Sequence, residues 1–456
     1  MTRLTRRQAL QAGLLGAACA AAPGPAAAGR DRPVPADLSF LRDSPLMDGD
    51  RARFFMRQEG MDALVVAQPA NVFYVSNHWP QLARMGYTHT MFAVLARDPA
   101  RPIALVLNAF GYYYSHSDET AFTDRIVYTY TQADGSAAPA GDGDPPAVEP
   151  QALRIVDEAL VTPRERRRRQ MLAGIQGNHA TAAGALVAAL RELGLEKAAL
   201  GTDDPAIEAI LRPRGIEGRF IAADDTLRRI RLAKSPAELR LMRLAAQRNV
   251  EAAFAAARFA REAGSTRALR ARFMAEAALR GNIGTFMVID RSSSEVMDWP
   301  LRDGMSVSID CVSTCRNYHG DFGRTIFIGE PREPMRRAVH AVVAAWDELR
   351  GSLRAGLRFS EIPRIGREAL RKQGADVTVS FRPHSVGLFH TDQPRNDLSQ
   401  GRTAPDLVLE ENMILSVDCP ILDAGLGGSA HLEDLMLIRA DGAEPIHEIG
   451  ERVIVV

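Results

Sequence analysis

The sequence of 456 residues contains few cysteines and no excess charge of either sign. Its four cysteines are too few and too irregularly spaced for a disulfide framework or a zinc ribbon. Lysine plus arginine and aspartate plus glutamate both number 56, so no overall electric field would attract nucleic acid or an anionic membrane. No phosphate-binding glycine loop, nucleic-acid motif or repeat of solenoid length is evident. The composition, 46% hydrophobic and 25% charged, is that of a globular protein, and the length suits two domains.

The N-terminal segment has the pattern of an export signal rather than of a folded element. The pair Arg6-Arg7 lies in a stretch that resembles a twin-arginine signal. The apolar run over residues 9–22 is shorter than the ~20 residues needed to span a bilayer, and small residues follow it, as a signal peptidase site requires. We therefore predict a signal peptide over residues 1–29, a periplasmic or secreted location and no membrane span in the mature chain. Lipidation at Cys19 is a weaker alternative.

Residues 36–222 alternate short apolar runs with helical patterns, which is typical of an α/β layer domain. A stretch rich in glycine, proline, aspartate and alanine at residues 134–146 is predicted to be an exposed insertion. The other predicted elements are strands at residues 63–67, 72–75, 91–95 and 103–107 and helices at residues 150–160 and 165–193.

A long helix is predicted to open the second half of the chain. Ser235 can cap it, Pro236 suits its first turn, and Glu238 completes a capping box with the serine. We place the domain boundary just before this region, which gives an N-terminal domain over residues 36–222 and a C-terminal domain over residues 223–456.

Two predicted strands in the second half follow a strict period of two. Residues 305–310 and 413–418 each place apolar side chains on one face, and each ends in an aspartate on the other face, Asp310 and Asp418. A lone carboxylate that faces the interior costs several kcal/mol unless it is paired or bound to a metal. Taken singly, each aspartate could equally be a turn or cap residue.

Five residues in ordered motifs carry a resemblance to a known family. The pair Asp310 and Asp321, His384 with His390 downstream, Asp418 before a Cys-Pro step, and Glu433 before Asp434 together resemble the M24 metallopeptidase family of Xaa-Pro aminopeptidases, prolidases and creatinase. The resemblance implies a creatinase-like α/β N-terminal domain and an α+β C-terminal domain with the pita-bread fold. It also implies a homodimer.

The resemblance further implies a centre with two divalent metal ions, of manganese, cobalt, iron or zinc. Asp321 and Glu433 would bridge both ions, Asp310 would complete one site, and His384 with Asp418 would complete the other. His390 would contact the substrate or the developing oxyanion, and Asp418 would occupy the place of a glutamate that takes part in catalysis. Four clustered carboxylates repel one another unless cations neutralise them, which suits such a centre.

The sequence departs from the family pattern at four places, one of which is a spacing from His384 to His390 that is one residue short. Asp418 replaces a glutamate and shortens the side chain by one methylene. Residues 282–304 contain no histidine, although the peptidases usually place one there that contacts the substrate. His431 stands two residues before Glu433, where aminopeptidase P-like members often have arginine. These changes concern the substrate side more than the scaffold.

Three functions therefore stay open. The leading one is a metal-dependent hydrolase of small peptides, which cleaves an N-terminal residue ahead of proline. The second is a creatinase-like hydrolase or lyase that acts on a small non-peptide substrate, because the pocket rather than the fold sets the reaction. The third is a pita-bread module without metals that only binds a partner.

Overall fold

The computed structural model describes residues 37–115, 125–131, 154–395 and 403–456. The predicted signal peptide with Cys19 and the predicted insertion lie outside these residues. Residues 37–456 form one compact unit, so the division into two domains stays a prediction.

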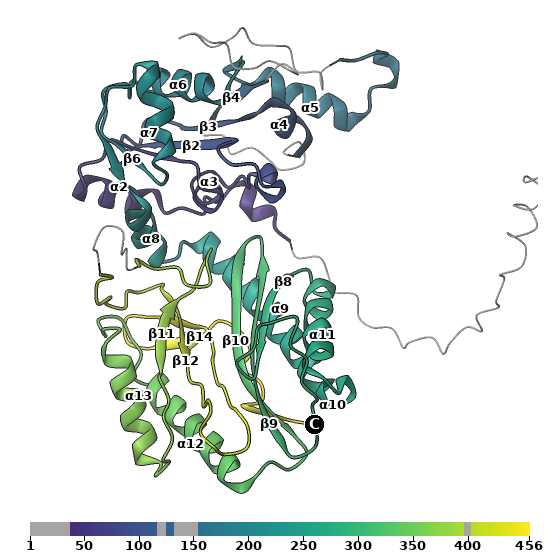
Figure 1. Cartoon of the computed structure of the whole chain (residues 1–456). Coiled ribbons are helices and arrows are strands. Elements are labelled where there is room, and N and C mark those ends of the chain that lie inside the picture. The colour runs from purple at the N-terminus through teal and green to yellow at the C-terminus, as the bar shows by residue number, and fades with distance from the viewer. Residues whose placement is uncertain (1–36, 116–124, 132–153, 396–402) are drawn as a thin grey trace, which may run out of the picture. The chain divides into compact units, whose positions relative to one another are not determined.

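A seven-stranded sheet organises the first half of the described chain (Figure 1). Its strand order is β5-β4-β3-β2-β1-β6-β7, with antiparallel pairs only at β1/β2 and β2/β3. The strands are β1 (Ala63–Val66), β2 (Met91–Ala96), β3 (Ile103–Asn108), β4 (Arg125–Tyr130), β5 (Gly177–His179), β6 (Leu200–Thr202) and β7 (Phe220–Ala222). The helices of this half are α2 (Gly49–Gln58), α3 (Pro69–Ser76), α4 (Ala109–Ser115), α5 (Pro163–Ala173), α6 (Ala182–Glu192) and α7 (Ala206–Leu211).

Both faces of this sheet are covered, which explains its continuous apolar strands. Leu64 and Val66 of β1 face a core shared with α2 and α3, whereas Ala63 and Val65 face a core shared with α6 and α7. The predicted strands at residues 63–67, 91–95 and 103–107 are thus confirmed.

Three of the predicted elements in this half are wrong. In the described part of the predicted helix at residues 150–160, only a short 3₁₀ turn at Glu158–Leu160 is helical. Residues 72–75 belong to the helix α3. A residue far away in the sequence stabilises the start of this helix: Asp203 accepts hydrogen bonds from the backbone N–H groups of Ala67 and Gln68 and from the side chain of Asn71. The helix is buried almost all round, so its sequence shows no amphipathic period. The predicted helix at residues 165–193 is divided into α5 and α6 by the strand β5.

Two four-stranded sheets form the second half, in the orders β15-β10-β9-β8 and β11-β12-β13-β14. Helices α9 and α11 pack on the first sheet, and α12 and α13 lie beside the second (Figure 1). The strands are β8 (Ile283–Ile289), β9 (Met305–Cys315), β10 (Tyr318–Ile328), β11 (Arg382–Ser385), β12 (Ile414–Asp418), β13 (Met436–Ile438), β14 (Ala443–Pro445) and β15 (Val453–Val455). The helices are α8 (Asp224–Leu232), α9 (Pro236–Arg258), α10 (Ala260–Ala263), α11 (Thr266–Leu279), α12 (Glu333–Arg350) and α13 (Glu361–Lys372).

Helix α9 begins as the sequence predicts. The hydroxyl of Ser235 accepts from the backbone N–H of Glu238, the carboxylate of Glu238 accepts from the backbone N–H of Ser235, and Pro236 occupies the first turn. This capping box satisfies two helix-end groups at once and fixes where the helix starts.

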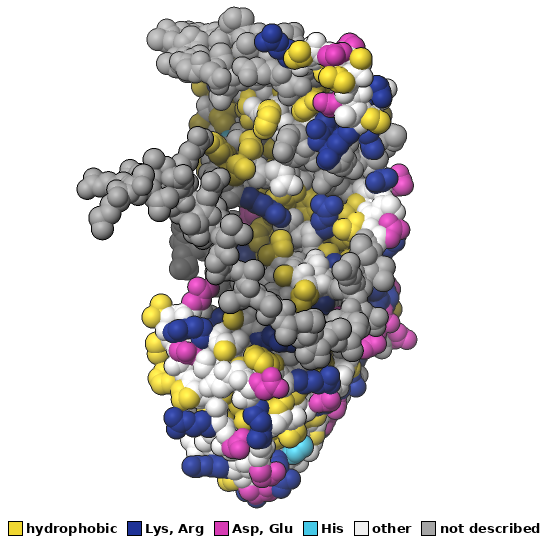
Figure 2. All heavy atoms as spheres, turned by 90° about the vertical axis from the view of Figure 1, so that its right-hand side faces the viewer, with side chains coloured by type: hydrophobic (Ala, Val, Ile, Leu, Met, Phe, Trp, Pro, Cys, Tyr) yellow, Lys and Arg dark blue, Asp and Glu magenta, His cyan; other side chains and the backbone are white. Residues whose placement is uncertain are grey.

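Charged side chains of both signs are interspersed over the face drawn in Figure 2, in keeping with the balanced composition. Among the helices in the described part of the chain, none combines the length and the apolar character needed to cross a membrane.

Candidate metal centre

The hairpin of β9 and β10 brings the first two predicted ligands to one face. Asp310 lies opposite Gly323, and Asp321 lies opposite Val312. Residues opposite each other, and residues two apart along a strand, share a face of the sheet. Asp310 and Asp321 are therefore diagonal neighbours.

The second sheet contributes the histidine and the third aspartate. His384 of β11 lies opposite Ser416 of β12, and Asp418 follows two residues later at the end of that strand. The same alternation therefore places His384 and Asp418 on one face.

Glu433 joins the two sheets. Its backbone forms an antiparallel bridge to Gly323 of β10, with hydrogen bonds of 3.2 and 3.1 Å in the two directions. A Cβ atom at Gly323 would lie 2.1 Å from a ring carbon of His431 and 2.9 Å from the Cβ of Glu433. Only glycine allows this close approach.

All five predicted ligands meet at this junction. The Nε2 atom of His384 lies 3.3 Å from Glu433, 3.6 Å from Asp321 and 3.8 Å from Asp418. Three groups could each hold a metal ion, with ligand atoms within 4.8 Å of one another: Asp310, His431 and Glu433; His384, Asp418 and Glu433; and Asp321, His384 and His390. Glu433 and His384 each belong to two of these groups.

The buried carboxylates of the cluster lack hydrogen-bond partners among the described residues. Both carboxylate oxygens of Asp321 and one of Asp310 are buried and accept no hydrogen bond. Burial, followed by repulsion from Glu433, raises the pKa of Asp310 to about 7 and that of Asp418 to about 6, and it raises the pKa of Asp321 well above its usual range. The protein alone therefore does not stabilise all these groups as anions.

Glu433 is the exception within the cluster. Burial opposes its ionisation, but hydrogen bonds from His384 and His431 hold its pKa well below the usual range. Burial likewise opposes the charge of His431, yet its 3.0 Å contact with Glu433 raises the pKa of the imidazole to about 9.

His431 is the residue of this centre to which the sequence analysis assigned no role. Glu433 follows His431 by two residues and lies on the same side of the segment, and His431 is 6% exposed. Its Nε2 atom is 3.8 Å from Asp418, and its Nδ1 atom is buried without a hydrogen-bond partner. In the sequence, the sign that this position is unusual was that His431 stands where aminopeptidase P-like members often have arginine.

His390 lies at the more exposed side of the cluster. Its side chain is 34% exposed, its Nε2 atom is 3.2 Å from Asp321, and its ring packs edge-on against Phe286 at 5.4 Å. Asp418, with 29% of its side chain exposed, is the other accessible member. An incoming molecule can reach these two side chains, whereas Asp321 and Glu433 are fully buried.

A buried ion pair holds the loop that carries His390. Asp392 accepts hydrogen bonds from Arg231 at 3.0 and 3.1 Å and from the backbone N–H of Leu388, and its own N–H donates to the carbonyl of Ser385. His319 adds a backbone hydrogen bond to Gly387 in the same loop. His319 therefore supports the loop of His390 and belongs to none of the three ligand groups.

The donor set fits divalent cations. Oxygen-rich ligation with some imidazole suits manganese, cobalt, iron or zinc. Cations would also neutralise the carboxylate oxygens that accept no hydrogen bond.

Comparison with known proteins agrees with the fold, and the matched region contains the proposed ligands. Residues 240–440 match the model of metallopeptidase family M24. The "Probable dipeptidase PepE" of Mycobacterium tuberculosis is 28% identical over 52% of this chain and 64% of its own length. The mitochondrial methionine aminopeptidase 1D of Mus musculus is 29% identical over 30% of this chain and 39% of its own length. The chain thus spans less than two thirds of the length of these curated relatives.

Solved structures match over almost their full length. The Xaa-Pro dipeptidase from Bacillus anthracis aligns with a TM-score of 0.61 and 17% identity, over 90% of this chain and 99% of that one. The X-Pro aminopeptidase from Thermotoga maritima gives 0.61 and 16%, with the same coverage. The predicted fold class is confirmed: the chain has the pita-bread fold of these enzymes, and residues 240–440, which include all the proposed ligands, match metallopeptidase family M24.

Proposed function

We propose that the protein is a metal-dependent hydrolase that cleaves the peptide bond ahead of proline in small peptides. The observation that carries the proposal is the meeting of four carboxylates and three imidazoles in which buried carboxylate oxygens accept no hydrogen bond. The names of the relatives, Xaa-Pro dipeptidase and X-Pro aminopeptidase, supply the substrate class.

Two divalent ions would be held by the five predicted ligands. Asp310 and Glu433 belong to one group, His384, Asp418 and Glu433 to another, and Asp321 adjoins His384. Glu433 is thus suited to be shared. Such ions supply a lowered pKa for bound water and polarisation of a substrate carbonyl.

The residues of the chain would orient and stabilise the substrate. His390 can donate a hydrogen bond to the substrate or to the oxyanion that develops from its carbonyl, because its ring is accessible and its loop is held by Asp392. Asp418, the other accessible member, can accept a proton or a hydrogen bond from the substrate side.

The test is to measure metal content by plasma mass spectrometry and Xaa-Pro dipeptide cleavage on the same purified sample. About two ions per chain with proline-directed cleavage would support the proposal. The matched variants are Glu433→Gln, which should lose both metal and activity, and Glu444→Gln, a partly exposed glutamate of β14 outside the cluster, which should lose neither. Cleavage by Glu433→Gln at the wild-type rate would refute the metal centre.

A non-peptide substrate is the second candidate. It is favoured by His431, which places an imidazole 3.8 Å from Asp418, and by the lack of histidine in residues 282–304, where Phe286 packs against His390 instead. Two ions without any Xaa-Pro cleavage would favour this candidate. A module without metals is disfavoured because the buried carboxylates would cost stability without cations.

Export and assembly are proposed from the sequence and the resemblance. The twin-arginine pattern of residues 1–29 supports export to the periplasm or beyond, and the mature N-terminus of secreted protein tests it. A homodimer is tested by light scattering of the purified chain.

A further inference from the structure

A cavity lies in the N-terminal half and shares no residue with the candidate metal centre. It has a volume of about 600 Å³ and is bordered by the first turns of α2, the end of α3 and the strands β2, β3 and β4. This volume falls within the ~300–1,000 Å³ typical of pockets for small molecules.

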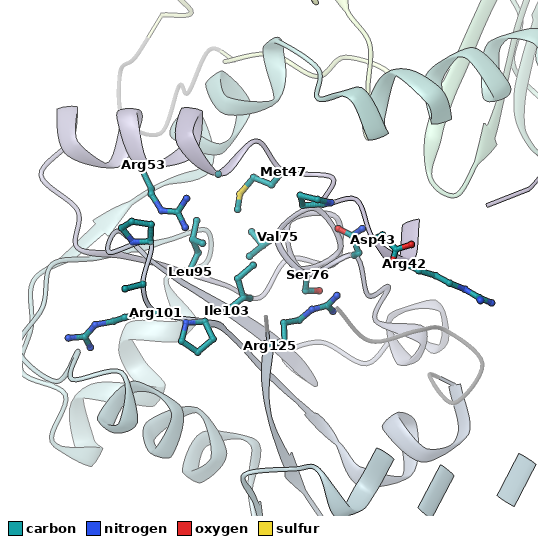
Figure 3. A pocket seen from close by; sticks show the side chains of 16 residues that line it. Arg42, Asp43, Met47, Arg53, Val75, Ser76, Leu95, Arg101, Ile103 and Arg125 are labelled. Carbon is teal, nitrogen blue, oxygen red and sulfur yellow. The ribbon is translucent and has the colours of Figure 1, made fainter. Parts of the chain in front are cut away.

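The charge around this cavity is strongly one-sided. Four arginines and one aspartate line it: Arg42, Arg53, Arg101, Arg125 and Asp43. The chain as a whole carries equal numbers of acidic and basic residues, so this excess is local. Figure 3 shows Arg53 and Arg125 on opposite sides of an apolar group that consists of Met47, Val75, Leu95 and Ile103.

Arg53 has donor capacity left for a ligand. Its side chain is 17% exposed, and its Nε atom is buried without a hydrogen-bond partner. The carboxylate of Asp50 pairs with Arg53 only loosely, because Asp50 is fully exposed and lies 3.8 Å from a terminal nitrogen, beyond hydrogen-bond distance. Arg101 has a similarly loose pair, 3.6 Å from the exposed Asp98. Such solvent-screened pairs compete weakly with a ligand oxyanion.

We propose that this cavity binds a small organic oxyanion, a carboxylate or phosphate group on a compact apolar body. The guanidinium of Arg53 would bind the oxyanion, since its planar fork matches such groups. The side chains of Leu95, Val75 and Met47, each less than 5% exposed, would contact the apolar body. The neighbouring hydrogen-bonding groups are already used: Ser76 donates to Val72, and Asn77 bonds to the loop before α2.

Calorimetric titration of the full chain tests the proposal, with EDTA present so that the metal centre does not contribute. The probes are phenyl phosphate, benzoate, inorganic phosphate and the neutral benzamide. At least one of phenyl phosphate and benzoate should bind saturably, with one site per chain, and at least tenfold more tightly than inorganic phosphate and benzamide. Whichever binds better identifies the oxyanion.

Variants on one helix provide the control. Arg53→Met should weaken binding at least tenfold, and Gly49→Ala should weaken it too, because a Cβ there would lie 2.7 Å from a terminal nitrogen of Arg53. Arg57→Met removes an exposed arginine of α2 that does not line the cavity and should bind as wild type does. Circular dichroism and the melting temperature verify folding. Three results would each overturn the site: no saturable binding, an unchanged affinity in Arg53→Met and Gly49→Ala, or an equal loss in Arg57→Met.

Discussion

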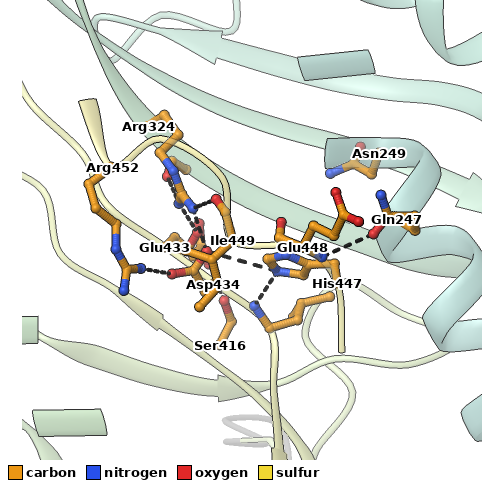
Figure 4. A network of polar contacts seen from close by, with 12 residues as sticks. Gln247, Asn249, Arg324, Ser416, Glu433, Asp434, His447, Glu448, Ile449 and Arg452 are labelled. Atoms are coloured by element: carbon orange, nitrogen blue, oxygen red, sulfur yellow. Dashed lines mark hydrogen bonds and ion pairs between the residues drawn. The ribbon is translucent and has the colours of Figure 1, made fainter. Parts of the chain in front are cut away.

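Glu433 and Asp434 are neighbours in the sequence, and both are fully buried, but they have opposite surroundings. Asp434 accepts hydrogen bonds from Arg324 at 2.7 Å and Arg452 at 3.0 Å (Figure 4). It also accepts one from the indole N–H of Trp346 at 3.2 Å. Arg324 in turn donates to four backbone carbonyls as well. Within this network, the positive charges of the two arginines compensate the negative charge of Asp434.

Glu433 faces the other way, toward three further carboxylates. Because successive residues of an extended segment point to opposite sides, one chain segment supplies both environments. His384 and His431 compensate Glu433 itself, but Asp321 and Asp310 keep oxygens without partners. Asp434 thus has its own cations, whereas Asp321 and Asp310 would need cations from outside to be stable as anions.

Among the substitutions that test this contrast, Asp321→Asn should have the largest effect. The variant should lose metal and reduce kcat/KM by roughly a thousandfold or more, about 4 kcal/mol of transition-state stabilisation. Its metal-free form should be as stable as wild type or more stable, because burial opposes ionisation of Asp321 and neither of its carboxylate oxygens accepts a hydrogen bond. Plasma mass spectrometry, dipeptide assays and urea unfolding in EDTA give the three measurements. Metal retention at the wild-type level would contradict the comparison.

Asp434→Asn should do the reverse. Removing the carboxylate leaves the buried charge of Arg324 unpaired, so the free energy of unfolding should fall by about 3–5 kcal/mol with or without metal. Asp347→Asn removes an exposed partner of Arg452 and serves as the control, with an expected loss of at most about 1 kcal/mol. Equal unfolding midpoints for wild type and Asp434→Asn would show that the network is dispensable.

A substitution of His431 tests whether this residue belongs to the metal centre. If its imidazole belongs to the metal centre, His431→Gln should weaken metal binding by about 10- to 100-fold. Competition with a chelator measures this without reference to activity. His340→Gln replaces a histidine of α12 outside the ligand groups and should leave the affinity unchanged. An unaltered affinity in His431→Gln would assign His431 to the substrate side alone.

The contrast between Glu433 and Asp434 was not predictable from the sequence. The sequence analysis treated Glu433 and Asp434 as one motif. A motif gives the order of the residues but does not show which surroundings each side chain meets. The sequence could place the five proposed ligands together because each lies at a fixed place in a local pattern of strand or loop. His431 was noticed only as a departure, since its distance from Asp418 depends on how two sheets meet at Gly323.

The fold was predictable where structure is local and less so where it is not. The capping box of α9 is complete within four residues and was predicted correctly. The start of α3 depends on Asp203, more than 130 positions away in the chain, and was missed. The cavity at Arg53 was missed for the same reason, because its wall combines residues from α2, β2 and β3.

Glu238 represents a third kind of buried carboxylate, and its substitution should have the smallest effect of those considered. It accepts hydrogen bonds from the backbone N–H of Ser235 and from the hydroxyl of Tyr318, and among the described residues no arginine or proposed metal ligand pairs with it. Burial, partly offset by the charge of Lys234, raises its pKa from 4.5 to about 7. Between these values the folded chain holds a proton that the unfolded chain has released, so this group's contribution to stability falls as the pH rises through 7.

Glu238→Gln should therefore flatten the dependence of the unfolding free energy on pH in that window, by at most about 1.4 kcal/mol per pH unit. The amide can still accept from Ser235 and can donate to the hydroxyl of Tyr318, so the capping box survives. Urea unfolding at several pH values measures the slope, and Glu262→Gln, an exposed carboxylate of α10, should not change it. A slope in Glu238→Gln equal to that of wild type would mean that Glu238 is ionised across the whole window, and that two hydrogen bonds and a nearby lysine suffice to hold a buried carboxylate as an anion without an ion pair or a metal.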